Sequence, residues 1–124
     1  MKRHSLTLGV VVACALAGGC ASTPVPEAQV ASTQEAVQSA RQAGADRVPE
    51  ANKHLTMAED QLAKARTHIS KGDNDDALPL LTRAEYDAAL AAALSREAQQ
   101  KAATEAVIVR VQSVSAPMKQ PSGR

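Results

Sequence analysis

The chain has 124 residues, of which 26 are alanine and only one, Tyr86, is aromatic, and its formal net charge is +1. This length allows one domain at most. A single aromatic side chain excludes a base-stacking platform for single-stranded nucleic acid, and the near-zero charge excludes the basic surface that duplex binding needs. So few large apolar side chains also exclude a thick globular core. The composition therefore predicts a slender protein with no nucleic-acid partner.

The first 19 residues have the features of an export signal. Lys2 and Arg3 form a short positive segment, and residues 6–17 are apolar except for Thr7. This run is shorter than the ~20 residues that a helix needs to cross a ~30 Å hydrocarbon layer. We therefore expect residues 1–19 to be a cleaved secretory signal, with an uncleaved anchor helix as the alternative.

The apolar run ends in Leu16-Ala17-Gly18-Gly19-Cys20, which resembles the lipobox of bacterial lipoproteins. The resemblance implies cleavage between Gly19 and Cys20, and a membrane anchor of several acyl chains on Cys20. Several acyl chains are needed because a single acyl chain binds membranes only marginally. Ala17 stands where that motif prefers leucine. Ala21, which follows the cysteine, implies by the same resemblance a periplasm-facing position on the outer membrane of a Gram-negative cell. An ordinary thiol beside a plain cleavage site is the alternative for Cys20.

The cysteine count agrees with a lipid on Cys20. The only other cysteine, Cys14, lies inside the signal, so the mature chain would hold one cysteine and no internal disulfide. Removing 19 of the 124 residues leaves 105, with 12 basic and 13 acidic side chains and a formal charge of −1. No polybasic surface remains to bind anionic lipid.

Residues 20–26 are expected to be the lipidated cysteine and a tether. Two prolines, Pro24 and Pro26, interrupt this segment of small residues and favour an extended linker. Residues 21–26 reach at most ~20 Å at ~3.3 Å per residue. The folded part would therefore stay close to the membrane surface.

We predict an all-α domain over residues 27–112. The first helix is expected from Glu27 to Ala43, with Gly44 ending it. The second is expected from Pro49, a residue suited to a first helical turn, to Ser70, with Gly72 ending it. Residues at heptad spacing predict a packing seam on this second helix: Ala51, Leu55, Ala58, Leu62, Ala65 and Ile69.

The third helix is expected to start near Asp75 or Asp76 and to reach Val111 or beyond. An N-cap at Asp76 would place Pro79 at the third helical position, where proline is tolerated. At ~1.5 Å per residue the helix should overhang the second by about 20 Å, or break. Its seam is predicted to be Ala77, Leu81, Ala84, Ala88 and Ala91, widened by Leu80, Leu90 and Leu94.

The short turn between the second and third helices predicts an antiparallel hairpin, with the first helix laid along it as a thin three-helix bundle. Alanines at the seam let the backbones approach closely and favour helix locally. We expect a marginal monomer, or weak self-association through an exposed seam. Residues 113–124 carry two prolines and no periodicity, and we expect them to be a disordered tail.

Candidate chemistry is sparse, and we predict no catalytic, cofactor or metal site. His54 and His68 lie 14 residues apart on one predicted helix, or ~21 Å along its axis, so they cannot share a zinc ion. We interpret both as surface histidines. The acidic residues 73–76 lack the glycine and glutamate of an EF-hand loop, which favours solvated N-capping carboxylates. Tyr86 is expected to be a packing lid over the first helix, with a recognition residue as the alternative.

Two stretches, residues 40–45 (Ala-Arg-Gln-Ala-Gly-Ala) and the alanines and leucines of residues 77–91, resemble a bacterial envelope lipoprotein family known as domain of unknown function 4398. The resemblance covers about residues 27–105. Family members tend to have an aromatic-Ala-Pro segment before the second helix, of which this chain keeps only Pro49. The resemblance implies an inward aspartate, Asp87, whose burial would require a partner such as Arg41 or Arg83. It also implies a cell-envelope setting but no reaction. We expect the partner to be an envelope protein or a peptidoglycan-associated protein.

The sequence thus predicts a non-enzymatic outer-membrane lipoprotein that acts as a structural or protein-interaction module in the periplasm. The main alternative is a single tetratricopeptide-like helical module that binds a periplasmic protein or peptide, although such units need roughly three copies to bury a shared core. An enzyme would require a cleft with convergent titratable groups. A murein-lipoprotein-like spacer would require a terminal lysine, whereas this chain ends in Gly123 and Arg124.

Overall fold

The computed structural model describes residue 24 and residues 26–115. The predicted signal, Cys20, most of the tether and residues 116–124 lie outside the described residues. The described part consists of three α-helices, α1 (Glu27–Gln42), α2 (Pro49–Lys71) and α3 (Asn74–Ser115), with a single 3-10 turn, η1 (Ala45–Arg47), between the first two. The prediction of an all-α fold is confirmed.

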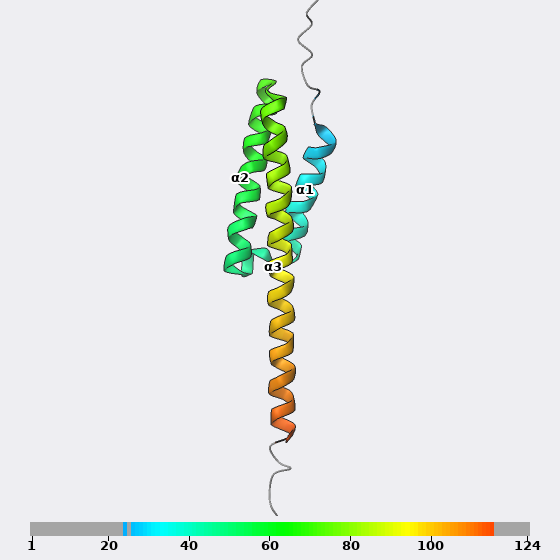
Figure 1. Cartoon of the computed structure of the whole chain (residues 1–124), viewed down its shortest axis with the longest axis vertical. Coiled ribbons are helices and arrows are strands. Elements are labelled where there is room, and N and C mark those ends of the chain that lie inside the picture. Colours follow the sequence, from blue (N-terminus) through cyan, green and yellow to red (C-terminus); the bar gives the residue numbers. More distant parts are fainter. Residues whose placement is uncertain (1–23, 25, 116–124) are drawn as a thin grey trace, which may run out of the picture.

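α2 and α3 form an antiparallel hairpin, and α1 lies along it (Figure 1). The turn consists of Gly72 and Asp73 alone. Gly72 has φ +85°, a left-handed conformation that glycine adopts without a Cβ penalty, and its N–H donates to the Ile69 carbonyl at 3.0 Å. The Asp73 N–H donates to the His68 carbonyl at 3.0 Å. So short a turn places the two helices side by side.

Both predicted seams form the core. The five seam residues of α3 from Ala77 to Ala91 are 0% exposed, and those of α2 up to Ala65 are at most 5% exposed. The seams face each other within one chain, so they are not available to join two copies. Leu80 and Leu94 pack partly against the core, but Leu90 is 42% exposed, and the prediction that it widens the stripe is wrong.

α1 adds Thr33, Val37 and Ala40 to the same core. Thr33 is fully buried, and its hydroxyl donates to the Gln29 carbonyl at 2.7 Å. On α3, the buried Ser95 hydroxyl donates to the Ala91 carbonyl in the same way, at 2.8 Å. These bonds satisfy the two hydroxyls within their own helices and allow them to replace apolar side chains in the core.

Glycine and proline set the junction between α1 and α2 as predicted. Gly44 has φ +80° and follows the end of α1, and its N–H donates to the Arg41 carbonyl at 2.9 Å. Pro49 is the first residue of α2, where its missing N–H breaks no helical hydrogen bond. The chain therefore turns back through η1 over only a few residues.

α3 is a single unbroken helix that extends well beyond the bundle (Figure 1). Its 42 residues span ~63 Å, whereas the 23 residues of α2 span ~35 Å. We call residues 96–115 the α3 arm. All of them are exposed except the half-buried Ala98. The overhang is therefore confirmed and the predicted break is absent from this helix.

α1 ends at Gln42 and α2 ends at Lys71, each one residue from its predicted end. The start of α3 and the start of the predicted tail also differ from the sequence prediction. α3 begins at Asn74, so Pro79 is its sixth residue and lies inside the helix rather than in the first turn. Its ring is exposed, so the core is not displaced, and the cost is the N–H donor that proline lacks. Residues 113–115, which were predicted to belong to a disordered tail, are helical, and the rest of that predicted tail lies outside the described residues.

Candidate functional site

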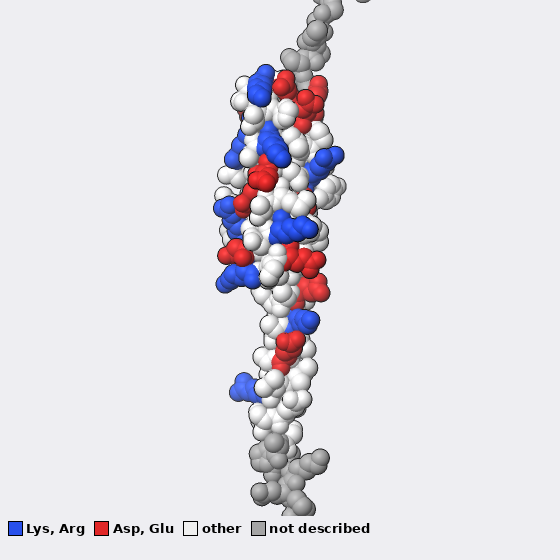
Figure 2. All heavy atoms as spheres, turned by 90° about the vertical axis from the view of Figure 1, so that its left-hand side faces the viewer, with Lys and Arg blue, Asp and Glu red and all other residues white. Residues whose placement is uncertain are grey.

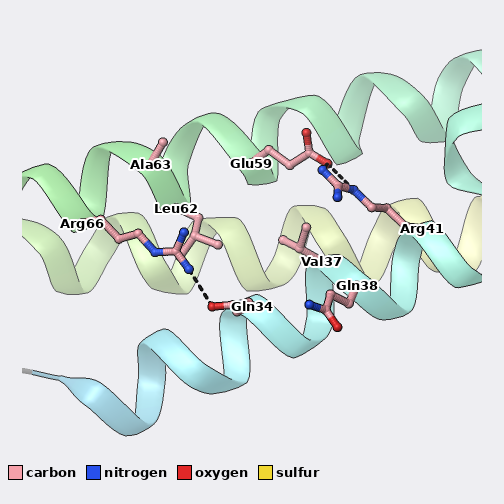
Figure 3. Close-up of a pocket in the computed structure, with 8 residues that line it drawn as sticks. All are labelled: Gln34, Val37, Gln38, Arg41, Glu59, Leu62, Ala63 and Arg66. Carbon is pink, nitrogen blue, oxygen red and sulfur yellow. Dashed lines mark hydrogen bonds and ion pairs between the residues drawn. The ribbon is translucent and has the colours of Figure 1, made fainter.

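A groove runs between α1 and α2, because each packs closely against α3 and less closely against the other. In the close-up, side chains from both helices point toward one another across this α1–α2 groove (Figure 3). Its cavity has a volume of about 250 Å³ and is lined by Gln34, Val37, Gln38, Arg41, Glu59, Leu62, Ala63 and Arg66. Val37 and Leu62 are buried in the core, so the groove has an apolar floor and polar walls.

Two guanidinium groups bridge the walls of the groove (Figure 3). Arg41 of α1 donates from Nε to Glu59 Oε1 of α2 at 2.9 Å, and its Nη2 lies 2.8 Å from the same oxygen. Arg66 of α2 donates to Gln34 Oε1 of α1 at 2.6 Å. The side chain of Arg41 is 60% exposed, so an ion pair of this kind contributes at most about 1 kcal/mol. An anionic ligand could exchange for these partners at small cost.

A second, more apolar hollow continues the groove toward the start of α1. It has a volume of about 370 Å³ and shares Gln34 and Arg66 with the first. Val30 and Ala31 of α1 and Ile69 of α2 line it. The groove therefore changes from polar to apolar along its length.

Asp87 joins α2 to α3 through two hydrogen bonds. His54 donates from Nδ1 to Oδ1 at 3.0 Å, and Gln61 donates from Nε2 to Oδ2 at 2.8 Å. The His54 and Asp87 side chains are only 24% and 18% exposed. The interpretation of His54 as a surface histidine is therefore wrong. The expected arginine partner for Asp87 is also wrong, since Arg41 pairs with Glu59 instead.

The other histidine of the described residues, His68, lies at the turn end of α2. Its side chain is 36% exposed, and its Nδ1 lies 3.9 Å from Asp73 Oδ2 and 4.0 Å from Asp76 Oδ2. Within the described residues, no three His, Cys, Asp or Glu side chains group closely enough to hold a metal ion. The polar contacts around Asp87 and His68 therefore connect helices and helix ends.

The surface of α3 is rich in exposed apolar side chains. Tyr86 is 73% exposed, so the prediction that it forms a lid over α1 is wrong. On the arm, the exposed large hydrophobic side chains are Val107 at 61%, Ile108 at 50%, Val109 at 64%, Val111 at 59% and Val114 at 66%. The face of the molecule in Figure 2 shows acidic and basic side chains interspersed over the bundle, with fewer along the arm. An apolar helix surface of this kind is typical of an interaction site.

Comparison with known proteins gives one match. A family model described as domain of unknown function (DUF4398) matches residues 28–107. The chain belongs to the DUF4398 family. The DUF4398 match begins at the second residue of α1 and ends at Val107, the first exposed large hydrophobic residue of the arm. No curated protein and no solved structure matches the chain.

Among the residues described, no helix combines the length and the apolar character that a membrane span requires.

Proposed function

We propose that this DUF4398 protein is a non-enzymatic outer-membrane lipoprotein, anchored through acyl chains on Cys20, whose helices form a structural or protein-interaction module in the periplasm. The lipobox-like sequence before Cys20 motivates the anchor. The observation that supports the interaction role is that the fold has two different ends. α1 begins at one end of the bundle, and the α3 arm leaves from the opposite end (Figure 1).

Because the start of α1 and the arm lie at opposite ends, the membrane anchor would be far from the binding surface. Cys20 precedes Glu27 by seven residues, which reach at most ~23 Å. α3 then spans ~63 Å in the direction away from the start of α1. An anchored chain would thus hold its bundle near the membrane and present the apolar arm tens of ångströms deeper in the periplasm. A partner there would be an envelope protein or a peptidoglycan-associated protein.

The polar groups of the described bundle support a role without catalysis. The carboxylate of Asp87 already accepts hydrogen bonds on both oxygens, and Glu59 is held by Arg41. Nucleophilic catalysis would require a nucleophile, a base and a group that orients the base to converge in one cleft. In the α1–α2 groove the charged groups instead bridge two helices.

Fractionation of cell envelopes tests the anchor. The full chain is expected in the outer-membrane fraction, and Cys20→Ser is expected to be lost from that fraction, because serine provides no sulfur for the thioether-linked lipid. Ser22→Ala, two residues further on, is the matched control and should remain with the membrane. An identical distribution of the Cys20→Ser and unaltered chains would contradict the proposal. Purified lipidated protein that recovers neither a partner nor peptidoglycan from envelope extracts would contradict the interaction role.

A second candidate function is a tetratricopeptide-like module that binds a peptide, and the α1–α2 groove favours it. Two guanidinium groups above an apolar floor suit a short acidic peptide. Titration with a labelled acidic peptide should then show binding that Arg66→Ala weakens at least about tenfold, or about 1.4 kcal/mol. Lys53→Ala, on an exposed part of α2 outside the groove lining, is the control. No binding at millimolar peptide would eliminate this candidate.

A further inference from the structure

The outward surface of α3 carries a second line of residues at heptad spacing, which we call the outer stripe. Its members follow each other in alternating steps of four and three residues, and every one of them is exposed. They are Tyr86, Leu90, Ala93, Glu97, Gln100, Thr104, Val107, Val111 and Val114. Of the eight large hydrophobic side chains that are exposed in the described residues, five belong to this stripe. The pattern extends from the bundle to the last turn of the arm.

The outer stripe lies on the side of α3 that faces away from the bundle. Each residue of an α-helix is rotated by about 100° from the one before, so residues two apart are about 200° apart. Leu90 is two residues from the buried Ala88, and Ala93 is two residues from the buried Ala91. α1 and α2 therefore leave the stripe exposed, although Glu97 lines a shallow hollow with Val48 and Glu50 at the start of α2. A strict heptad line drifts by about 20° per heptad on a straight helix, and a left-handed supercoil removes this drift when two such helices pair.

We propose that the outer stripe is the interface of a homodimer, in which two copies of this chain pair their α3 helices in parallel and in register as a left-handed coiled coil. The parallel orientation rests on the proposed anchor, because two copies held by the same membrane point their arms in the same direction. In such a pair each stripe residue meets the same residue of the second copy across the axis. Apolar contacts then occur at both ends, around Leu90 and around Val111.

The charged residues near the middle of the stripe are complementary in this arrangement. Each heptad of a parallel, in-register coiled coil has two seam positions, a and d. The residue just before position a on one helix lies beside position a of the second helix. Arg96 precedes Glu97, and both are exposed. The two Glu97 carboxylates would meet at this layer, and each would also face Arg96 of the second copy, so the two Glu97–Arg96 pairs on opposite sides of the axis offset the like charges. Together with Gln100 and Thr104, these polar positions would fix the register, as buried polar residues do in other coiled coils.

Cysteine scanning of the full chain in intact envelopes tests the interface. Single cysteines are introduced at stripe positions Val107, Val111 and Val114, and at Ala106, Val109 and Ser113 on other faces of the arm, followed by a mild added oxidant. Like residues on a parallel seam bring their Cβ atoms toward the 3.5–4.5 Å that a disulfide needs. We expect disulfide-linked dimers at the three stripe positions, at least about fivefold above the other three. The parent chain without an added cysteine gives the background from Cys20.

Several results would overturn the homodimer. These are cross-linking that is equal at all six positions, cross-linking that is absent at all six, or a product with the mass of a different partner. Cross-linking at one stripe position only would overturn the parallel register, because an antiparallel pair brings like residues together only at its centre. Fractionation of the same cells reports on the anchor separately. A chain outside the membrane fraction with stripe-periodic cross-links would contradict the proposed function and support the dimer.

A matched pair of substitutions gives an independent measurement. Val111 and Val109 are the same residue type with similar exposure, 59% and 64%, but lie on opposite sides of the arm. In a chain that carries Val107→Cys, Val111→Lys should reduce the cross-linked dimer at least about fivefold, since it places two like charges at the seam. Val109→Lys should leave the dimer unchanged. Equal losses from both substitutions would refute the outer stripe as the interface.

Discussion

Replacing Asp87 with alanine should destabilise the bundle, because this carboxylate connects α2 to α3. Asp87 accepts hydrogen bonds from His54 at 3.0 Å and from Gln61 at 2.8 Å. Its removal leaves two donors at a helix interface without their acceptor. Gln61 Oε1 is already buried without a hydrogen-bond partner, so Gln61 has little to gain by rotating its amide. The substitution should therefore weaken the hairpin itself.

The expected magnitude follows from three terms. A hydrogen bond to a charged group contributes about 1.5–3 kcal/mol. The Asp87 side chain is 18% exposed, so water replaces part of that contribution, and the two bonds add incompletely. Alanine is a better helix former than aspartate by roughly 0.6 kcal/mol, which offsets part of the loss. The net loss should be about 2 kcal/mol, or about 8–16 °C in Tm for a domain of this size.

Thermal and urea unfolding followed by circular dichroism measure this loss. Glu85→Ala is the control, because Glu85 is exposed and only two residues away on the same helix, so its effect should stay within about 0.5 kcal/mol. Asp87→Asn should be intermediate, since it keeps one acceptor oxygen and loses the charge. If Asp87→Ala and Glu85→Ala unfold at the same temperature, Asp87 is a surface carboxylate and the hydrogen bonds contribute nothing.

Three further substitutions test the packing and the helix boundaries by the same unfolding assays. Leu81→Ala removes a fully buried side chain of the seam and should cost about 2–5 kcal/mol; a loss below about 1 kcal/mol would show that the seam does not carry the core. Gly44→Ala forces alanine to φ +80° and brings its Cβ within 2.5 Å of Arg47 Nη2, so it should cost about 1–2 kcal/mol, and a neutral effect would contradict the left-handed turn. Pro79→Ala restores an N–H donor inside α3 and should stabilise the chain by about 1–3 kcal/mol; destabilisation would mean that the ring makes a favourable contact.

The seams could be predicted because heptad spacing in an alanine-rich chain fixes which face of each helix is apolar. The ends of α1 and α2 could be predicted because Gly44 and Gly72 provide the left-handed residues that end a helix. The buried hydroxyls of Thr33 and Ser95 were missed because the seam was defined by apolar residues alone. Each hydroxyl is satisfied by the carbonyl four residues earlier, and this possibility exists at any seam position with serine or threonine.

His54 and Gln61, the partners of Asp87, do not follow from charge alone. They follow from the register in which α2 and α3 pair. A turn at Gly72 and Asp73 sets Asp87 opposite Ala58 of α2, and His54 and Gln61 lie four and three residues on either side of Ala58. The length of the turn is therefore enough to predict that His54 and Gln61 lie beside Asp87. Arg41, the expected partner, lies on α1, whose position relative to the hairpin does not follow from heptad spacing on any one helix.

The exposure of Tyr86 and Leu90 depends on the side of α3 along which α1 lies. Each of these residues could have packed under a neighbour if α1 had crossed the outer side of the hairpin. α1 instead lies where its Thr33, Val37 and Ala40 reach the common core, so the outward surface of α3 is left open. The outer stripe is visible only after the inner seam has been assigned to contacts within the monomer.

Intact mass spectrometry of the protein purified from cell envelopes is the most direct test of the proposed anchored module. The proposed processing gives a chain that begins at Cys20, has 105 residues and carries the added mass of three acyl chains and a glyceryl group. A chain that retains residues 1–19, begins at another residue, or carries Cys20 as an unmodified thiol would contradict it.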